Sequence, residues 1–259
     1  AGDVTFATGA DILTASAGDD NVRIGLDAGD SIASGGNRNI VIGRNAGTAI
    51  TTADSNVAIG WEALKTEDAH GNNVAIGASA LSLQNAGADG YNVGIGYNAG
   101  TAVTTGIRNS LVGGQSGDAL NAGLDNTALG YNSLSTETSG ARSVAVGSEA
   151  LATQNVGSGT AVYNSALGYA AGNAVTSGIN NTFIGGRAGL LTTTASNNTS
   201  VGSNSLRANT TGHTNSSFGH DSMRFNTTGA QNVAVGQQAL HNNTTASDNV
   251  AVGFKTLFD

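Results

Sequence analysis

The chain has 259 residues with no cysteine, no proline and 39 glycines, and its formal net charge is −8 with only 10 basic residues. The lack of cysteine excludes a disulfide framework and thiolate metal sites. So few basic residues argue against a basic face for nucleic acid or for an anionic bilayer. No apolar run approaches the roughly 18 residues of a membrane-spanning helix, so we also expect no membrane insertion.

Residues 1–20 are the first predicted element. The segment 4–9, VTFATG, resembles the five-residue motif that fills the rest of the chain, but it lacks the asparagine that opens that motif. Terminal repeats are usually atypical because they cap the stack. We therefore predict a degenerate capping coil over residues 1–20 and a repeat array over residues 21–259.

From residue 21 the chain repeats the pattern Asn-x-x-apolar-Gly. Fourteen copies end in a glycine, here called the repeat glycine, and ten of the thirteen intervals between repeat glycines are 17 residues. Representative copies open and close at Asn56 and Gly60, Asn73 and Gly77, Asn126 and Gly130, and Asn232 and Gly236. A fixed short period is the sequence signature of a repeat architecture.

Each motif predicts a five-residue strand. Its fourth position is always apolar and mostly β-branched, which favours a strand, and positions two and four share one side. The repeat glycine is expected to adopt a backbone conformation that other residues avoid. Thirteen copies open with asparagine, and stacked coils would place these amides one above another, each able to bond the next. The exception is Ser143.

The segment after each repeat glycine carries a compensating pattern. The third residue past it is always Ala, Ser or Thr, and the fourth is either glycine or a large apolar residue. Where the fourth is glycine, as at Gly29, an apolar residue such as Ile32 lies seven positions past the repeat glycine. In one coil this apolar residue is Leu191, which lies one position earlier. Where the fourth is leucine, the seventh is polar, as Leu64 and Glu67 show. A close-packed interior that keeps one core side chain per coil would impose this pattern.

Four-coil blocks form a longer period, with blocks starting near residues 21, 92 and 164 and a partial block from residue 232. A 17-residue coil can hold two short strands and two turns, and fourteen coils at about 4.8 Å give a rod of roughly 65–70 Å. A single thin roll leaves one apolar face poorly covered. We therefore expect several rods to pack side by side, most simply as a parallel homotrimer.

The repeats resemble those of known fibres. Residues 126–134, NTALGYNSL, are similar to the repeat regions of bacteriophage tail fibres and tailspikes, and the array also resembles the left-handed β-roll heads of trimeric autotransporter adhesins. The resemblance implies a trimeric protein of the virion tail or the cell surface that forms a shaft or binds a host. It transfers no catalytic residue.

These observations predict an all-β fold, a left-handed parallel β-roll (β-solenoid) of about fourteen 17-residue coils, assembled as a homotrimer. We expect a structural or receptor-binding fibre protein of a phage tail, with itself and a host-surface glycan or protein as partners. The alternatives are the head of a bacterial trimeric adhesin, a polysaccharide-degrading tailspike and an ice-binding solenoid. Fold alone does not decide between them.

Aromatic residues directly follow several repeat glycines, and stacked coils would line them up along one edge of the rod. The candidates for glycan contact are Trp61, Tyr97, Tyr131 and Tyr169. Flat aromatic rings stack on sugars, and Tyr and Trp add a polar group. Packing at the corners of the coils or between chains is the favoured alternative.

No catalytic, cofactor or metal site is predicted. The four histidines are His70, His213, His220 and His241, and none belongs to a recurring Ser/Asp arrangement. The run His220-Asp221-Ser222 is adjacent in sequence only, which does not make a triad. We therefore expect no enzymatic activity and surface roles for the histidines.

Two further segments allow weaker alternatives. Asp19, Asp20, Asp27 and Asp30 are expected to form a solvated acidic cap, with a weak Ca²⁺ site as the alternative. Threonines recur at 51–52, 104–105, 192–194 and 210–211. They favour polar corners, with an ice-binding ladder as the alternative.

Overall fold

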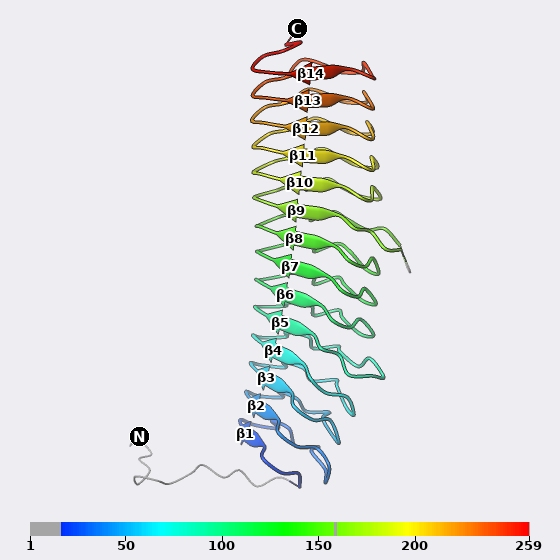
Figure 1. The fold of residues 1–259 in the computed structure, drawn as a ribbon. Helices are drawn as coiled ribbons and strands as arrows, with labels where there is room; N and C mark the ends of the chain where they lie inside the picture. Colours follow the sequence, from blue (N-terminus) through cyan, green and yellow to red (C-terminus); the bar gives the residue numbers. More distant parts are fainter. Residues whose placement is uncertain (1–16, 158–159, 259) are drawn as a thin grey trace, which may run out of the picture.

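The computed structural model describes residues 17–157 and 160–258, and this part of the chain forms fourteen strands and no helix. The strands are β1 (Val22–Ile24), β2 (Ile40–Ile42), β3 (Val57–Ile59), β4 (Val74–Ile76), β5 (Val93–Ile95), β6 (Ser110–Val112), β7 (Thr127–Leu129), β8 (Val144–Val146), β9 (Ser165–Leu167), β10 (Thr182–Ile184), β11 (Thr199–Val201), β12 (Ser216–Phe218), β13 (Val233–Val235) and β14 (Val250–Val252). They stack in sequence order as one parallel sheet along a rod (Figure 1). The predicted β-solenoid is confirmed.

The register of the sheet is the same throughout. Val57 lies opposite Val74, and Val74 lies opposite Val93, although the second step spans two more residues than the first. The extra residues of the longer intervals therefore lie in loops and leave the strands aligned. The predicted capping coil falls mostly on residues 1–16, which lie outside the described residues.

Each coil contains one strand of three residues, so the expected five-residue strand and second short strand are wrong. The second and fourth residues after the repeat glycine have left-handed φ angles, as in Glu62 (φ 55°) and Leu64 (φ 49°). Left-handed residues interrupt the extended conformation that a strand needs. Neighbouring coils are joined on that wall by separate hydrogen bonds, such as the one that the Gly47 N–H donates to the Ala63 carbonyl (2.9 Å).

The repeat glycines adopt φ angles between +127° and +137°, which confirms the expected special conformation. A Cβ added at Gly60 would lie 2.6 Å from the carbonyl carbon and oxygen of Gly77 in the next coil. Only glycine both reaches this φ without strain and lets the two backbones approach so closely.

The asparagine ladder is also confirmed. The Asn73 N–H donates to Oδ1 of Asn56 (3.0 Å), and both side chains are fully buried. Asn126 and Asn232 repeat the arrangement, and each also donates from Nδ2 to a carbonyl 14 residues further on. At the Ser143 exception, Gln154 completes the ladder by donating to the Ser143 hydroxyl and accepting from Asn164.

The interior keeps the predicted alternation of large side chains, and it adds a third position that the sequence analysis missed. The fourth-position leucines and the seventh-position apolar residues are buried, apart from Leu257 in the last coil. Three strands also carry a large central side chain, namely Val41, Leu111 and Phe183. A Cβ at Gly117 would lie 2.7 Å from Cδ2 of Leu111, so a fourth-position glycine makes room for the strand.

Leu191 does not fill the core as expected. Its side chain is 44 % exposed, and Thr192, at the seventh position, is buried in its place. The reason is Phe183, because a Cβ at Gly189 would overlap its ring. With that ring inside the coil, a small residue is enough at the seventh position.

Candidate functional site

The outer face of the sheet is the largest candidate surface. In β2 to β14 the central strand residue is buried, whereas its two neighbours point outward and are half-buried or exposed. In β3, for example, Ala58 is buried and Val57 and Ile59 are on the outer face. Positions two and four therefore share one side, as predicted, and that side faces away from the core.

This outer face is apolar along the length of the rod. Its fourth-position column holds only Ile, Val, Leu and Phe, and exposure reaches 53 % at Leu167 and 64 % at Val252. The second-position column is Val or Ile in eight coils and small and polar in the other six, at Ser110, Thr127, Ser165, Thr182, Thr199 and Ser216. No charged side chain stands in either column. The molecule thus exposes an apolar stripe along the whole sheet, which is one side chain wide where the second position is Ser or Thr and two side chains wide elsewhere.

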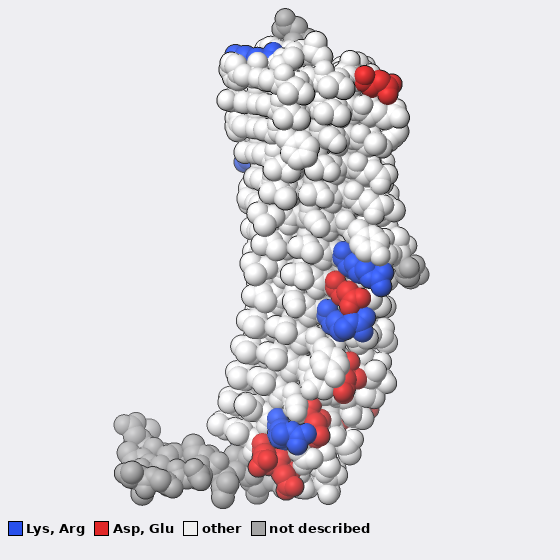
Figure 2. All heavy atoms as spheres, in the orientation of Figure 1, with Lys and Arg blue, Asp and Glu red and all other residues white. Residues whose placement is uncertain are grey.

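Charged residues gather on one edge of this stripe (Figure 2). Several of them stand in the column formed by the residue directly before the opening residue of each motif. Arg108 donates from Nε to Asp125 (2.6 Å), and Arg142 lies 3.8 Å from the same carboxylate. The Arg108 hydrogen bond lowers the pKa of Asp125, and Asp125 in turn raises the pKa of Arg108. These ion pairs join charged residues of three successive coils along this edge.

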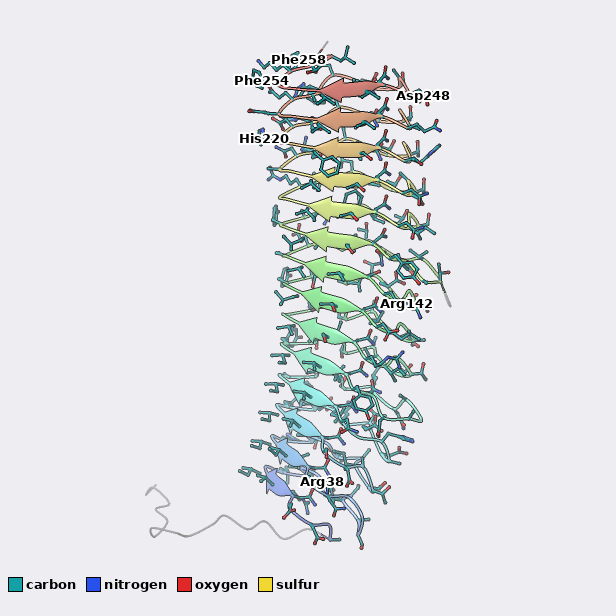
Figure 3. All side chains as sticks on the ribbon, in the orientation of Figure 1. Arg38, Arg142, His220, Asp248, Phe254 and Phe258 are labelled. Atoms are coloured by element: carbon teal, nitrogen blue, oxygen red, sulfur yellow. The ribbon has the colours of Figure 1, made fainter. Side chains whose placement is uncertain are left out.

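The four candidate aromatics line the opposite edge. Trp61, Tyr97, Tyr131 and Tyr169 are 51–62 % exposed, and each directly follows a repeat glycine. Figure 3 shows the two edges. His220 and Phe254, which also directly follow repeat glycines, project on one side, and Arg142 and Asp248 of the charged column project on the other. The expected alignment along one edge is consistent with the backbone, since the Glu149 N–H donates to the Tyr131 carbonyl one coil earlier.

The aromatic column has a regular spacing that the sequence analysis did not notice. The aromatics occupy every second coil, and the coils between them place Ala78, Gly114 and Ser148 at the same position. Two strand spacings amount to about 9.6 Å. We call the four aromatic residues and the small residues between them the aromatic ladder. It presents flat rings separated by shallow gaps.

The histidines do not form a nucleophilic site. His220 is exposed and lies 3.3 Å from Asp221, but the Ser222 hydroxyl is buried 2.6 Å from that of Ser217. His241 is buried between the rings of Phe225 and Phe258, at centroid distances of 5.0 and 4.9 Å, so the expected surface role is wrong for this histidine. His213 contacts only its neighbour Thr214 among the hydrogen bonds of its side chain in the described residues.

Apart from Asn243, the polar residues at the seventh position are buried, a feature that the sequence did not suggest. Glu137 is fully buried, and its Oε1 accepts from three consecutive backbone N–H groups, of Thr138, Ser139 and Gly140. Its Oε2 accepts from Gln154 Nε2 (3.1 Å) and from the Val156 N–H (3.3 Å). Both carboxyl oxygens of Glu137 therefore have hydrogen-bond donors.

Glu67 is the equivalent residue of the preceding block and is much less well supported. Its Oε1 accepts from the His70 N–H (3.1 Å), but Oε2 has no hydrogen-bond partner. Burial raises the pKa of Glu67 to about 7, and the nearby Asp68 charge adds to the rise, while the His70 N–H and the Gln84 amide oppose it. The Gln84 amide is close enough to favour the charge weakly, yet its Nε2 makes no hydrogen bond.

The aspartates near the start of the array do not gather into an ion site. Across residues 17–157 and 160–258, the group Glu67, Asp68 and His70 is the one set of three or more His, Asp or Glu whose ligand atoms converge. Asp27 and Asp30 line an open surface depression together with Glu62 and Lys65. The Ca²⁺ alternative therefore gains no support, and the solvated interpretation is retained.

The threonine hydroxyls bond the coils to one another. Thr193 donates to the Thr210 carbonyl and Thr210 donates to the Thr227 carbonyl, both at 3.1 Å. Thr51 makes the same bond to the Asp68 carbonyl (2.9 Å). These hydroxyls serve the polar corners, as the favoured interpretation predicted.

Comparison with known proteins adds no family. No family model matches the chain, and no curated protein and no solved structure matches it either. In the described part of the chain, no helix is long and apolar enough to cross a membrane. The functional argument therefore depends on the surfaces described above.

Proposed function

We propose that this chain is the subunit of a rigid phage tail fibre, in which three parallel copies pack their outer sheet faces together and form a shaft that holds or makes contacts with the host surface. The observation that carries this proposal is the uncovered apolar stripe. Monomeric soluble proteins rarely expose long contiguous apolar patches, and such patches mark interfaces.

A further copy of this chain is the occupant that fits the stripe best. Fourteen strands span thirteen spacings of about 4.8 Å, or roughly 62 Å. A helix rises about 5.4 Å per turn, so its side chains would drift out of step with the strands along such a length. An identical rod repeats at the same spacing and stays in register from end to end. The number three comes from the resemblance to trimeric fibres.

The aromatic ladder supports a receptor-contact role for the same fibre. Its rings lie at the edge of the stripe, half-exposed, where a partner can reach them. Aromatic faces stack on sugar rings, and a spacing of about 9.6 Å would place successive rings under separate residues of an extended glycan. The partner that we propose is therefore a host-surface polysaccharide.

The rival functions gain less support. A bacterial adhesin head would use the same stripe and differs in its source organism, so genomic neighbours would distinguish it. A polysaccharide-degrading tailspike needs two carboxyls about 5–9.5 Å apart. Asp27, Asp30 and Glu62 line the open depression described above, and a hydrolysis assay on bacterial polysaccharide would decide whether that depression is catalytic. The ice-binding alternative loses support because the threonine hydroxyls described above bond to carbonyls.

Charge placed on the stripe tests the proposal. We expect Ile59→Lys combined with Ile76→Lys to dissociate the assembly, because both side chains stand in the fourth-position column and would be desolvated between chains. The matched control is Ser79→Lys with Asn45→Lys, outside the strands. Sedimentation velocity should show smaller particles for the first variant alone. Equal sedimentation of both variants and the parent protein would contradict an interface on the stripe.

A further inference from the structure

The loop after the third strand brings together three metal-ligating side chains. One ligand atom from each of Glu67, Asp68 and His70 lies within 4.8 Å of those of the other two. Nδ1 of His70 is 3.8 Å from Oε1 of Glu67, which is too long for a hydrogen bond. The Glu67 side chain is fully buried, whereas the His70 side chain keeps about a third of its surface exposed (32 %). The cluster is thus anchored inside and open to solvent on one side.

Three buried polar atoms at this cluster lack a partner. They are Oε2 of Glu67, Nδ1 of His70 and Nε2 of Gln84. Leaving such a group unpaired destabilises the folded state, and more strongly when the group is charged. An unpaired buried polar group in a native protein therefore needs a physical explanation, and one such explanation is a bound ion that contacts the group.

The equivalent loop of the next block shows what a self-sufficient arrangement looks like. There Thr138, Ser139 and Gly140 replace Asp68, Ala69 and His70, and the Glu137 carboxylate receives the five donors described above. At Glu67 the chain has lost most of those donors and has gained a second carboxylate and an imidazole. The substitutions thus replace hydrogen-bond donors by ion ligands.

We propose that Glu67, Asp68 and His70 bind a divalent transition-metal ion of the Zn²⁺ class. A neutral imidazole nitrogen with two carboxylate oxygens is a ligand set that Zn²⁺ accepts, whereas Ca²⁺ prefers oxygen alone. Tetrahedral ligands at about 2.0–2.1 Å lie roughly 3.4 Å apart, so small side-chain rotations close the cluster. The exposed side leaves the fourth position to water.

An ion at this site would relieve the electrostatic conflict in the loop. A carboxylate oxygen of Glu67 and one of Asp68 lie within 4.8 Å of each other, and Oε2 of Glu67 has no hydrogen-bond partner. A divalent cation neutralises both. The loop is also bonded to the preceding coil, because Thr51 donates its N–H (2.7 Å) and its hydroxyl (2.9 Å) to the Asp68 carbonyl. Ion binding would thereby stiffen the junction between these coils. The metal-site inference does not depend on the proposed fibre function.

Calorimetric titration of the full chain with ZnCl₂ after chelator treatment tests the site. We expect one ion per chain with micromolar or tighter affinity, at least tenfold weaker binding for His70→Ala and for Glu67→Gln, and unchanged binding for His213→Ala and Glu137→Gln. The matched pair of Glu→Gln variants separates loss of a ligand from loss of a buried charge. Circular dichroism would confirm that each variant keeps the β-solenoid.

Two results would overturn the inference. One is the absence of saturable Zn²⁺ binding below millimolar concentration in the parent chain. The other is equal affinity in the parent chain and His70→Ala, which would place the bound ion elsewhere. CaCl₂ is the competing probe, and displacement of Zn²⁺ by equimolar Ca²⁺ would count against the imidazole ligand.

Discussion

Single residues in left-handed conformations set the shape of each coil. The repeat glycines permit a close approach between coils that no other residue allows, as shown by Gly60 against the Gly77 carbonyl. Gly186 offers an internal control, because an added Cβ there meets nothing within 4 Å and its φ is ordinary. Substitution by alanine is therefore expected to destabilise the protein at Gly60 and to have little effect at Gly186.

We predict that Gly60→Ala lowers the free energy of unfolding by about 2–4 kcal/mol, through strain at positive φ and overlap with the next coil. Gly186→Ala should change it by no more than about 0.5 kcal/mol. Urea denaturation followed by circular dichroism measures both. Similar midpoints for the two variants would be incompatible with the stacking role of the repeat glycine.

The fourth-position leucines combine strain with burial. Leu134 has a φ of 52° and is fully buried. A left-handed conformation costs a non-glycine residue roughly 1–2 kcal/mol, while burial of a leucine side chain contributes about 1.5–3 kcal/mol. Burial therefore holds the residue in a conformation that it would otherwise avoid.

This balance predicts an inverted ranking of substitutions. Leu134→Gly should be about 1 kcal/mol more stable than Leu134→Ala, because glycine relieves the strain while both remove the side chain. Leu120 is buried at the seventh position without a positive φ, so its alanine variant should be more stable than its glycine variant, which is the ordinary order. The unfolding temperatures of the four variants test this ranking. A higher unfolding temperature for the alanine variant than for the glycine variant at both positions would refute the argument.

At the scale of the coil, the interior is filled from three positions that trade volume. The sequence shows two of them, because Gly29 with Ile32 and Leu64 with Glu67 alternate in the printed order. The third, the strand centre, was missed because Leu111 and Phe183 alone look like ordinary strand residues. Their partners, Gly117 and Gly189, lie in the same coil, at positions that only the folded turn brings together.

Coupling between Gly117 and Leu111 tests this exchange of volume. We predict that Gly117→Ala and Leu111→Ala each destabilise the protein, and that the double variant is more stable than their sum by about 0.5–3 kcal/mol. The added Cβ occupies part of the space that Leu111 leaves. Gly117→Ala with Leu206→Ala is the control for a distant pair, and it should be additive. Additivity in both cycles would show that the two positions do not share one cavity.

Element-level prediction from the sequence succeeded where the cause is local and failed where it lies in a neighbouring coil. The repeat glycine and the stacked asparagines depend on one position repeated in phase, so the period alone reveals them. Leu191 was misplaced because its exposure depends on the Phe183 ring. The sequence shows Glu67 only as a polar residue at the seventh position, because its burial and its partners become visible only once Asp68, His70 and Gln84 are placed around it.

At the scale of the whole molecule, the rod has three distinct surfaces: an apolar stripe, an edge of paired charges and an aromatic ladder. The first coils curve, and the remainder of the rod is straighter (Figure 1). The period of the sequence predicted the rod and its uncovered face. It could not predict which apolar column faced outward, because alternation along a strand defines two sides without saying which one is covered.

The aromatic ladder makes a separate prediction about binding. We expect Trp61→Ala with Tyr97→Ala to reduce binding to immobilised bacterial surface polysaccharides at least tenfold, because stacking on two rings is lost. Leu191→Ala with Phe225→Ala, which removes exposed apolar groups elsewhere, should leave binding unchanged. Glycan arrays provide the measurement. Equal signals from both double variants would remove the ladder from receptor contact and leave the shaft role standing.

The mass of the particle in solution tests the central claim that the apolar stripe is covered by sister chains. One chain has a mass of 25.5 kDa, so a trimer has three times that value, about 76.5 kDa. Light scattering on the purified chain is expected to give the trimer mass across the eluting peak. A single species of 25.5 kDa at micromolar concentration would contradict the account, because the stripe would then be exposed to water in a stable monomer.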